Sequence, residues 1–135
     1  MVINSDQIAR IRVVTLGLTG LVCLSYAVLA LVLNRPDPMP WWVPGAFGVA
    51  SGLVIYAAAS IAPHNDRKMA MDELSREVSR RAAAHAYWVS LALFVLAFGT
   101  GFSPYFDTSA VVAAFGTSIA AAYLILFVWH DTRLG

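Results

Sequence analysis

Four long apolar segments constrain what this chain can fold into more than any other feature. They cover about residues 13–33, 41–62, 85–101 and 108–129, and none of them contains Asp, Glu, Lys or Arg. A helix of about 20 residues is about 30 Å long, which matches the hydrocarbon core of a bilayer. Strands are excluded because the segments are continuous rather than alternating, and because lipid requires backbone groups to bond within their own segment. We therefore predict an all-α integral membrane protein with four transmembrane helices, in one domain of residues 1–135.

Prolines mark the ends of the first two segments. Three prolines between residues 34 and 40 end the first, and Pro63 ends the second. Pro44 falls in the first turn of the second segment, where a missing N–H costs little. A cleaved secretory signal peptide is the alternative for the first segment, but its apolar region would be shorter and a small-residue cleavage site would follow. We therefore expect an uncleaved span.

The distribution of basic residues predicts the orientation. Eight of the nine lie before the first segment, between the second and third, or after the fourth; Arg35, between the first two, is the exception. Basic residues accumulate on the cytoplasmic side of membrane proteins. We therefore expect a protein of the bacterial inner membrane with both termini in the cytoplasm. Aromatic residues at both interfaces fit an anchoring belt. These are Trp41 and Trp42 on the outer side, and Tyr87, Trp88 and Trp129 on the inner side.

Residues 66–84 are predicted to form an amphipathic cytoplasmic helix. The stretch lacks Gly and Pro and is rich in good helix formers. No helix breaker separates it from the third segment, so the third transmembrane helix should extend into the cytoplasm as one helix from about residue 66 to 98. An apolar stripe and basic residues make this helix a candidate docking surface for a protein partner, for its own copy, or for inner-leaflet lipid. Its candidate binding residues are Met71, Leu74, Arg76, Val78, Arg80 and Arg81.

Small residues inside the segments predict close helix packing. Gly48 and Gly52 are four apart in the second segment, and Gly116 and Ala120 repeat that spacing in the fourth. These faces could serve packing within the chain or between copies. Scattered hydroxyl side chains are expected to bond between helices or back to their own helix. No Asp, Glu, Lys or Arg lies inside a segment, which argues against a proton-coupled transporter and against the small multidrug transporters with their first-span glutamate.

The three histidines, His64, His85 and His130, are each predicted at the cytoplasmic end of a different segment. Imidazoles at one depth could bind a metal ion or a haem, although no pair has local ligand spacing. No motif for acyl or phosphoryl transfer or for a zinc protease is present, so we expect no enzymatic activity and no obligatory cofactor. The lone Cys23 is expected inside a helix as a small apolar residue.

The stretch from Asp72 to Ala84, which leads directly into the third segment, resembles a pattern in a group of uncharacterised small four-span prokaryotic membrane proteins. Some of those are similar to membrane partners of small helix-turn-helix regulators. The resemblance covers about a quarter of the chain and implies a regulatory or accessory role. It assigns no functional residue.

Together these features predict a non-enzymatic accessory or regulatory subunit of the membrane that interacts through its cytoplasmic helix and its small-residue faces. Membrane lipid and a protein partner or homo-oligomer are the expected partners. A net charge of +1 gives no reason to expect direct nucleic-acid binding. One alternative is an oligomeric channel or carrier for a small neutral solute. The other is a metal- or haem-binding membrane protein.

Overall fold

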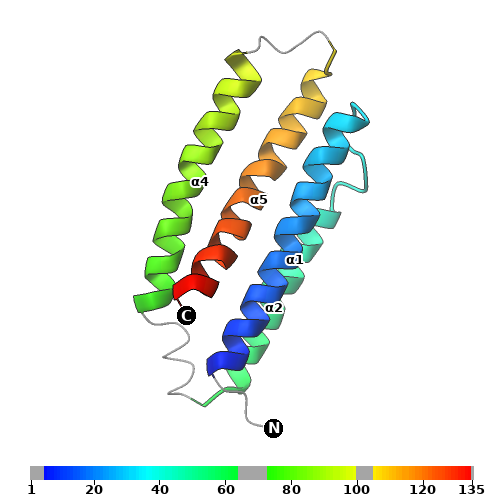
Figure 1. The fold of residues 1–135 in the computed structure, drawn as a ribbon. Helices are drawn as coiled ribbons and strands as arrows, with labels where there is room; N and C mark the ends of the chain where they lie inside the picture. The colour runs from blue at the N-terminus through cyan, green and yellow to red at the C-terminus, as the bar shows by residue number, and fades with distance from the viewer. Residues whose placement is uncertain (1–4, 64–72, 100–104, 135) are drawn as a thin grey trace.

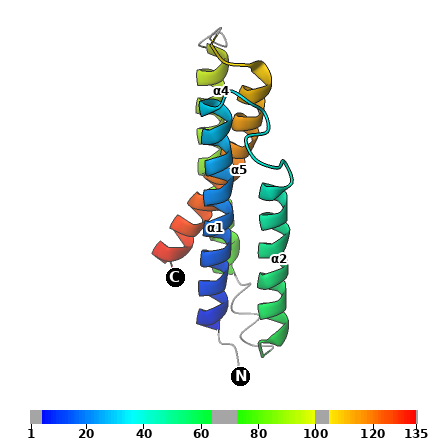
Figure 2. The ribbon, with the colours of Figure 1, turned by 90° about the vertical axis from the view of Figure 1, so that its right-hand side faces the viewer.

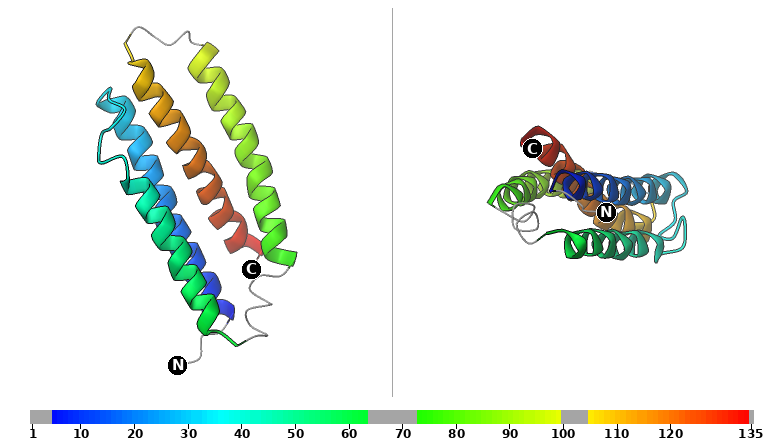
Figure 3. Two further views of the ribbon diagram at one scale, coloured as in Figure 1. Left: turned by 180° about the vertical axis from the view of Figure 1, so that it is seen from behind. Right: turned by 90° about the horizontal axis from the view of Figure 1, so that it is seen from below.

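The computed structural model describes residues 5–63, 73–99 and 105–134, and the helices in these ranges form an antiparallel row. The helices are α1 (Ser5–Val32), α2 (Val43–Ile61), α4 (Glu73–Gly99) and α5 (Thr108–Leu134). Helix α5 lies between α4 and α1, and α1 lies between α5 and α2, as Figures 1 and 3 show. The closest association joins α1 to α5, which are far apart in the sequence.

The connection from α1 to α2 is a well-defined helix end. The N–H of Arg35 donates to the carbonyl of Ala30 at 3.0 Å, and the N–H of Asn34 donates to that of Leu31 at 3.3 Å. Asn34 has a φ of 51°, the left-handed conformation that closes a helix in this way. Its side-chain oxygen also accepts the backbone N–H of Asp107 at 2.7 Å, which ties this turn to the start of α5.

Small side chains fill the interface between α1 and α5. Ala27, Ala30 and Ala114 form a buried cluster. At Gly20, an added Cβ would lie 3.2 Å from the Cβ of Leu124 and 3.2 Å from Cγ1 of Ile125. The helices can approach this closely only because these residues are small. Figure 2 shows the two helices crossing at an angle, with α2 beside α1.

Large apolar side chains point outward, which is the reverse of a water-soluble core. Leu18, Leu53 and Val112 are more than half exposed, while most of the buried apolar residues are alanines. Three described helices are long and apolar enough to cross a membrane, within Asp6–Val32, Val43–Ile61 and Thr108–Arg133. Lipid would cover their outer faces, so the structure supports a multi-pass membrane protein.

The sequence predicted four spans, and α4 is not among the three that length and composition identify in the described residues. The physical reason is that its N-terminal half carries five charged residues. These are Glu73, Arg76, Glu77, Arg80 and Arg81. The prediction of one unbroken helix is confirmed over Glu73–Gly99. Its predicted first part, residues 66–72, lies outside the described residues.

Candidate functional site

One end of the molecule, here called the basic end, gathers most of the charge. It comprises the N-terminal ends of α1 and α4 and the C-terminal end of α5 (Figure 1). Six of the seven arginines in the described residues belong to these helix ends; Arg35 follows the C-terminal end of α1, at the opposite end. They are Arg10, Arg12, Arg76, Arg80, Arg81 and Arg133.

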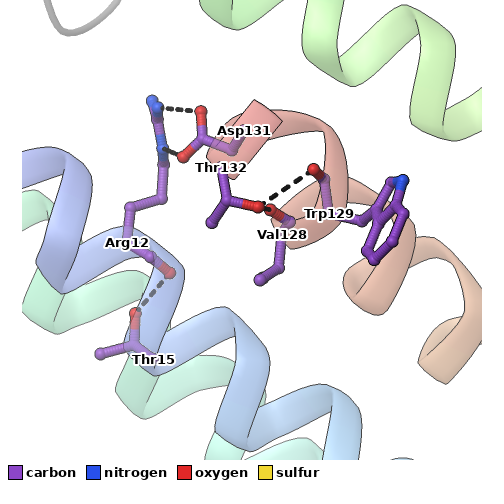
Figure 4. Close-up of polar contacts among 6 residues, drawn as sticks. All are labelled: Arg12, Thr15, Val128, Trp129, Asp131 and Thr132. Atoms are coloured by element: carbon purple, nitrogen blue, oxygen red, sulfur yellow. Dashed lines mark hydrogen bonds and ion pairs between the residues drawn. The ribbon is translucent and has the colours of Figure 1, made fainter. Parts of the chain in front are cut away.

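An ion pair joins α1 to α5 at the basic end. Nη2 of Arg12 lies 2.6 Å from Oδ1 of Asp131, and Nε donates to Oδ2 at 3.2 Å. Figure 4 shows the guanidinium and the carboxylate facing each other in this two-point contact. The side chains are only 15% and 7% exposed, so both charges are largely removed from water. Because such charges are costly without a partner, removal of either one should destabilise the helix pair.

The surroundings of Asp131 explain why it needs a cation. A carboxylate in the last turns of a helix faces the negative end of the helix dipole. The Arg12 guanidinium carbon also lies 5.6 Å from the centre of the Phe127 ring, one turn earlier in α5. In the same turns, the hydroxyl of Thr132 donates to the carbonyls of Val128 and Trp129 (Figure 4). Arg12 thus compensates the carboxylate and covers an aromatic face.

A second set of charges lies along the exposed side of α4. Oε1 of Glu77 accepts from Nε of Arg81 at 2.7 Å, and Oε2 accepts from Nε of Arg80 at 3.0 Å. These hydrogen bonds, first from Arg80 and then from Arg81, lower the pKa of Glu77 below its usual value. Glu77 therefore stays ionised at neutral pH. The two ion pairs have the three- and four-residue spacing that brings side chains together on a helix surface.

The apolar stripe of α4 is turned toward α5. Val78 is fully buried and forms a cluster with Ala82 and Phe127. The hydroxyl groups of Ser79 and Tyr123 lie 3.0 Å apart beside this cluster. The N-terminal half of α4 is therefore packed against its neighbour and does not project alone.

This packing corrects the predicted docking surface. The sequence assigned Val78 to partner binding, but α5 already covers it. Arg76, Arg80 and Arg81 are exposed, as a docking surface requires. Leu74 lies in the first turn of α4, and Met71 lies outside the described residues.

Two of the three histidines meet at the basic end. The ring centroids of His85 in α4 and His130 in α5 are 5.1 Å apart, with an angle of 34° between the ring planes. Nδ1 of His85 lies 2.8 Å from the carbonyl of Arg81. His64 lies outside the described residues. Among the residues described, no group of three or more His, Cys, Asp or Glu side chains could hold a metal ion.

The predicted small-residue motifs face away from the other described helices. An added Cβ at Gly48, Gly52 or Gly116 would meet no atom within 4 Å, and Ala120 is exposed. These residues do not pack against another described helix of this chain. Their role in helix packing stays a prediction, and it would concern contacts with another chain. The glycine that packs inside the chain is Gly20 in α1. It belongs to a row of small residues three or four apart on one face of that helix, with Cys23, Ala27 and Ala30.

Hydroxyl groups connect α1 to α2. Oγ1 of Thr19 and Oγ of Ser51 are 2.6 Å apart, and Ser51 also donates to the carbonyl of Thr15 at 3.1 Å. Both side chains are buried. Other hydroxyls bond to their own helix, as Thr117 does to the carbonyl of Ala113 at 2.8 Å. Both kinds of bond were predicted, and here they replace water inside an apolar assembly.

The sequence did not reveal the Arg12–Asp131 pair. Its two residues are 119 positions apart, one before the first apolar segment and one after the last. The available signal was that opposite charges flank the ends of two segments predicted to reach the same membrane side.

No protein-family model, curated protein or solved structure matches this chain.

Proposed function

We propose that this chain is a non-enzymatic accessory or regulatory subunit of the bacterial inner membrane, which binds a protein partner through its basic end. In this proposal α4 is the fourth span, because residues 82–99 contain no Asp, Glu, Lys or Arg. The N-terminal part of α4 then lies in the cytoplasm, together with both chain termini.

The proposed orientation is supported by two features that point the same way. Eight of the nine basic residues in the sequence belong to segments at one membrane side, which the positive-inside rule assigns to the cytoplasm. Exposed aromatic side chains lie near both helix ends, as interfacial anchors do. Trp41 and Tyr105 are 80% and 83% exposed at one end, and Trp88 and Trp129 are 66% and 50% exposed toward the other.

A single observation carries the proposed partner binding: the exposed arginine face of α4 is held rigid by packing on its other side. Val78 and Ala82 fix the helix against α5. The Arg80 and Arg81 side chains stay 80% and 51% exposed while Glu77 orders them. A pre-ordered charged helix face loses little side-chain freedom on binding, so it suits an acidic partner surface.

A photo-crosslinking residue in place of Arg80 tests this proposal in living cells. We expect one crosslinked protein product of defined mass from position 80. The same residue in place of Tyr105, which is equally exposed at the opposite end, is the matched control and should not give that product. Adducts to lipid alone from position 80, or one product common to both positions, would contradict the proposal.

A further inference from the structure

The rings of His85 and His130 form a contact between α4 and α5. His85 belongs to α4 and is exposed, and His130 belongs to α5 and is partly buried. Neither ring takes part in the buried cluster of Val78, Ala82 and Phe127. The His130 ring lies against the His85 ring.

The neighbouring charges are already paired with other groups. The Arg81 guanidinium contacts Glu77, and the Asp131 carboxylate contacts Arg12. The guanidinium carbon of Arg133 lies 4.1 Å above the Trp129 ring. These charged side chains therefore have described contacts with groups other than the two imidazoles.

The separation of the rings suits one bridging ion. Two imidazoles bound to one tetrahedral metal ion, with metal–nitrogen bonds of about 2.0–2.1 Å, have ring centroids about 5 Å apart. The observed separation is 5.1 Å. The separation and the 34° tilt between the ring planes are compatible with one ring nitrogen from each helix binding the same ion.

The hydrogen bond of His85 orients its ring. A carbonyl oxygen only accepts, so Nδ1 must carry the proton that it donates to Arg81. In the neutral ring the lone pair then lies on Nε2, the nitrogen left for a ligand. A ring N–H bonded to a backbone carbonyl is the usual way in which proteins orient a metal-binding histidine.

We propose that His85 and His130 form a two-histidine site for a divalent transition-metal ion, of the zinc, nickel or copper type, that bridges α4 and α5. Neutral imidazole favours these ions over magnesium or calcium. The remaining coordination positions would be filled by water or by an exogenous ligand. The site does not depend on the proposed partner binding.

The test is a copper titration of the full-length protein, purified in mild detergent with a tag that contains no histidine. Electron paramagnetic resonance should count one bound Cu²⁺ per chain, with two imidazole nitrogens coordinated. His85→Gln and His130→Gln should each weaken binding by at least about tenfold. His64→Gln is the matched control, and we expect it to bind copper as the wild type does.

A second readout needs no variant. Bound Zn²⁺ should protect the His85 and His130 rings from acylation by diethyl pyrocarbonate, measured by mass spectrometry of the peptides. Equal modification of both rings with and without Zn²⁺ would overturn the proposal, as would copper binding that is lost only in His64→Gln. Because both readouts are metal occupancy in the isolated protein, their failure would leave the crosslinking result at Arg80 unaffected.

Discussion

The α1–α5 interface and the outer face of α2 both carry glycines, but only the first is packed. At Gly20 an added Cβ would lie 3.2 Å from Leu124, whereas at Gly48 and Gly52 it would meet nothing within 4 Å. Both patterns permit close approach of another helix. The α1–α5 interface also has small residues on the opposing helix and the Arg12–Asp131 pair at its end. Small residues thus permit an interface, while opposing shape and charge select the partner.

The largest effect should come from filling the packed interface. Gly20→Leu is expected to destabilise the fold by about 3 kcal/mol, because Leu124 and Ile125 leave no room and the helices must separate. Gly48→Leu is the matched control and should change the free energy of unfolding little. Unfolding in mixed detergent and dodecyl sulfate would measure both. Equal losses of unfolding free energy in the two variants would contradict the difference in packing between Gly20 and Gly48.

The next largest effect should come from the ion pair that ends this interface. Asp131→Asn keeps the size of the side chain but removes the carboxylate charge that pairs with the largely buried Arg12. Buried pairs cost about 3–5 kcal/mol to break, and we expect about 2 kcal/mol here because the pair is partly open to solvent. Asp107→Asn, at the exposed opposite end, is the control for loss of a carboxylate. An unchanged free energy of unfolding in Asp131→Asn would show that packing alone determines the association of α1 with α5.

A smaller effect is expected where α2 joins α1. Ser51→Ala removes the hydrogen bonds to Thr19 and to the Thr15 carbonyl, and polar contacts between membrane helices contribute about 0.6 kcal/mol on average. Ser60→Ala is the control, because Ser60 bonds to its own helix at Tyr56. The same unfolding assay would compare them. If Ser51→Ala lowered the free energy of unfolding as much as Gly20→Leu, the contact of α1 with α2 would be as important for stability as its contact with α5.

The smallest effect should come from the exposed charges of α4, and it should depend on pH. The pKa of Glu77 is lowered in the folded protein by Arg80 and Arg81. Its contribution to stability is therefore present above the unfolded pKa, which lies near 4.5, and is lost as pH falls through the lower folded value. Glu77→Gln should lose this part of the acid dependence, measured by thermal unfolding from neutral pH to below about pH 4. An identical pH profile in the variant would show that these exposed contacts contribute nothing measurable.

The helices were predictable from sequence because their signals are local. Continuous apolar runs gave α1, α2 and α5, Pro44 lies in the first turn of α2 as expected, and Asp107 directly precedes α5. The start of α1 was less accessible, since Ser5–Arg12 is polar and extends the helix beyond the apolar run. Hydropathy identifies the part of a helix that lipid can cover. It does not detect a polar part of the same helix that continues beyond the lipid.

The packing order could not be predicted, because it depends on contacts between distant residues. Periodicity showed that Val78 lies on an apolar face, but not that Phe127 covers it. In the same way, charge counts placed His85 and His130 at one end, while only the pairing of α4 with α5 brings their rings together. Sequence therefore predicted which residues share an end of the molecule better than which residues touch.

The most direct test of the account is a quantitative purification of the protein from its native membrane in mild detergent. Wild type is compared with Arg76→Gln/Arg80→Gln/Arg81→Gln, which keeps five basic residues on the proposed cytoplasmic side, and with Arg35→Gln at the opposite end. We predict one companion protein in fixed ratio with wild type and Arg35→Gln, and its loss from the triple variant. A homo-oligomer without companions, or the same companions in all three preparations, would contradict a partner-binding subunit; the homo-oligomer would favour the channel or carrier alternative.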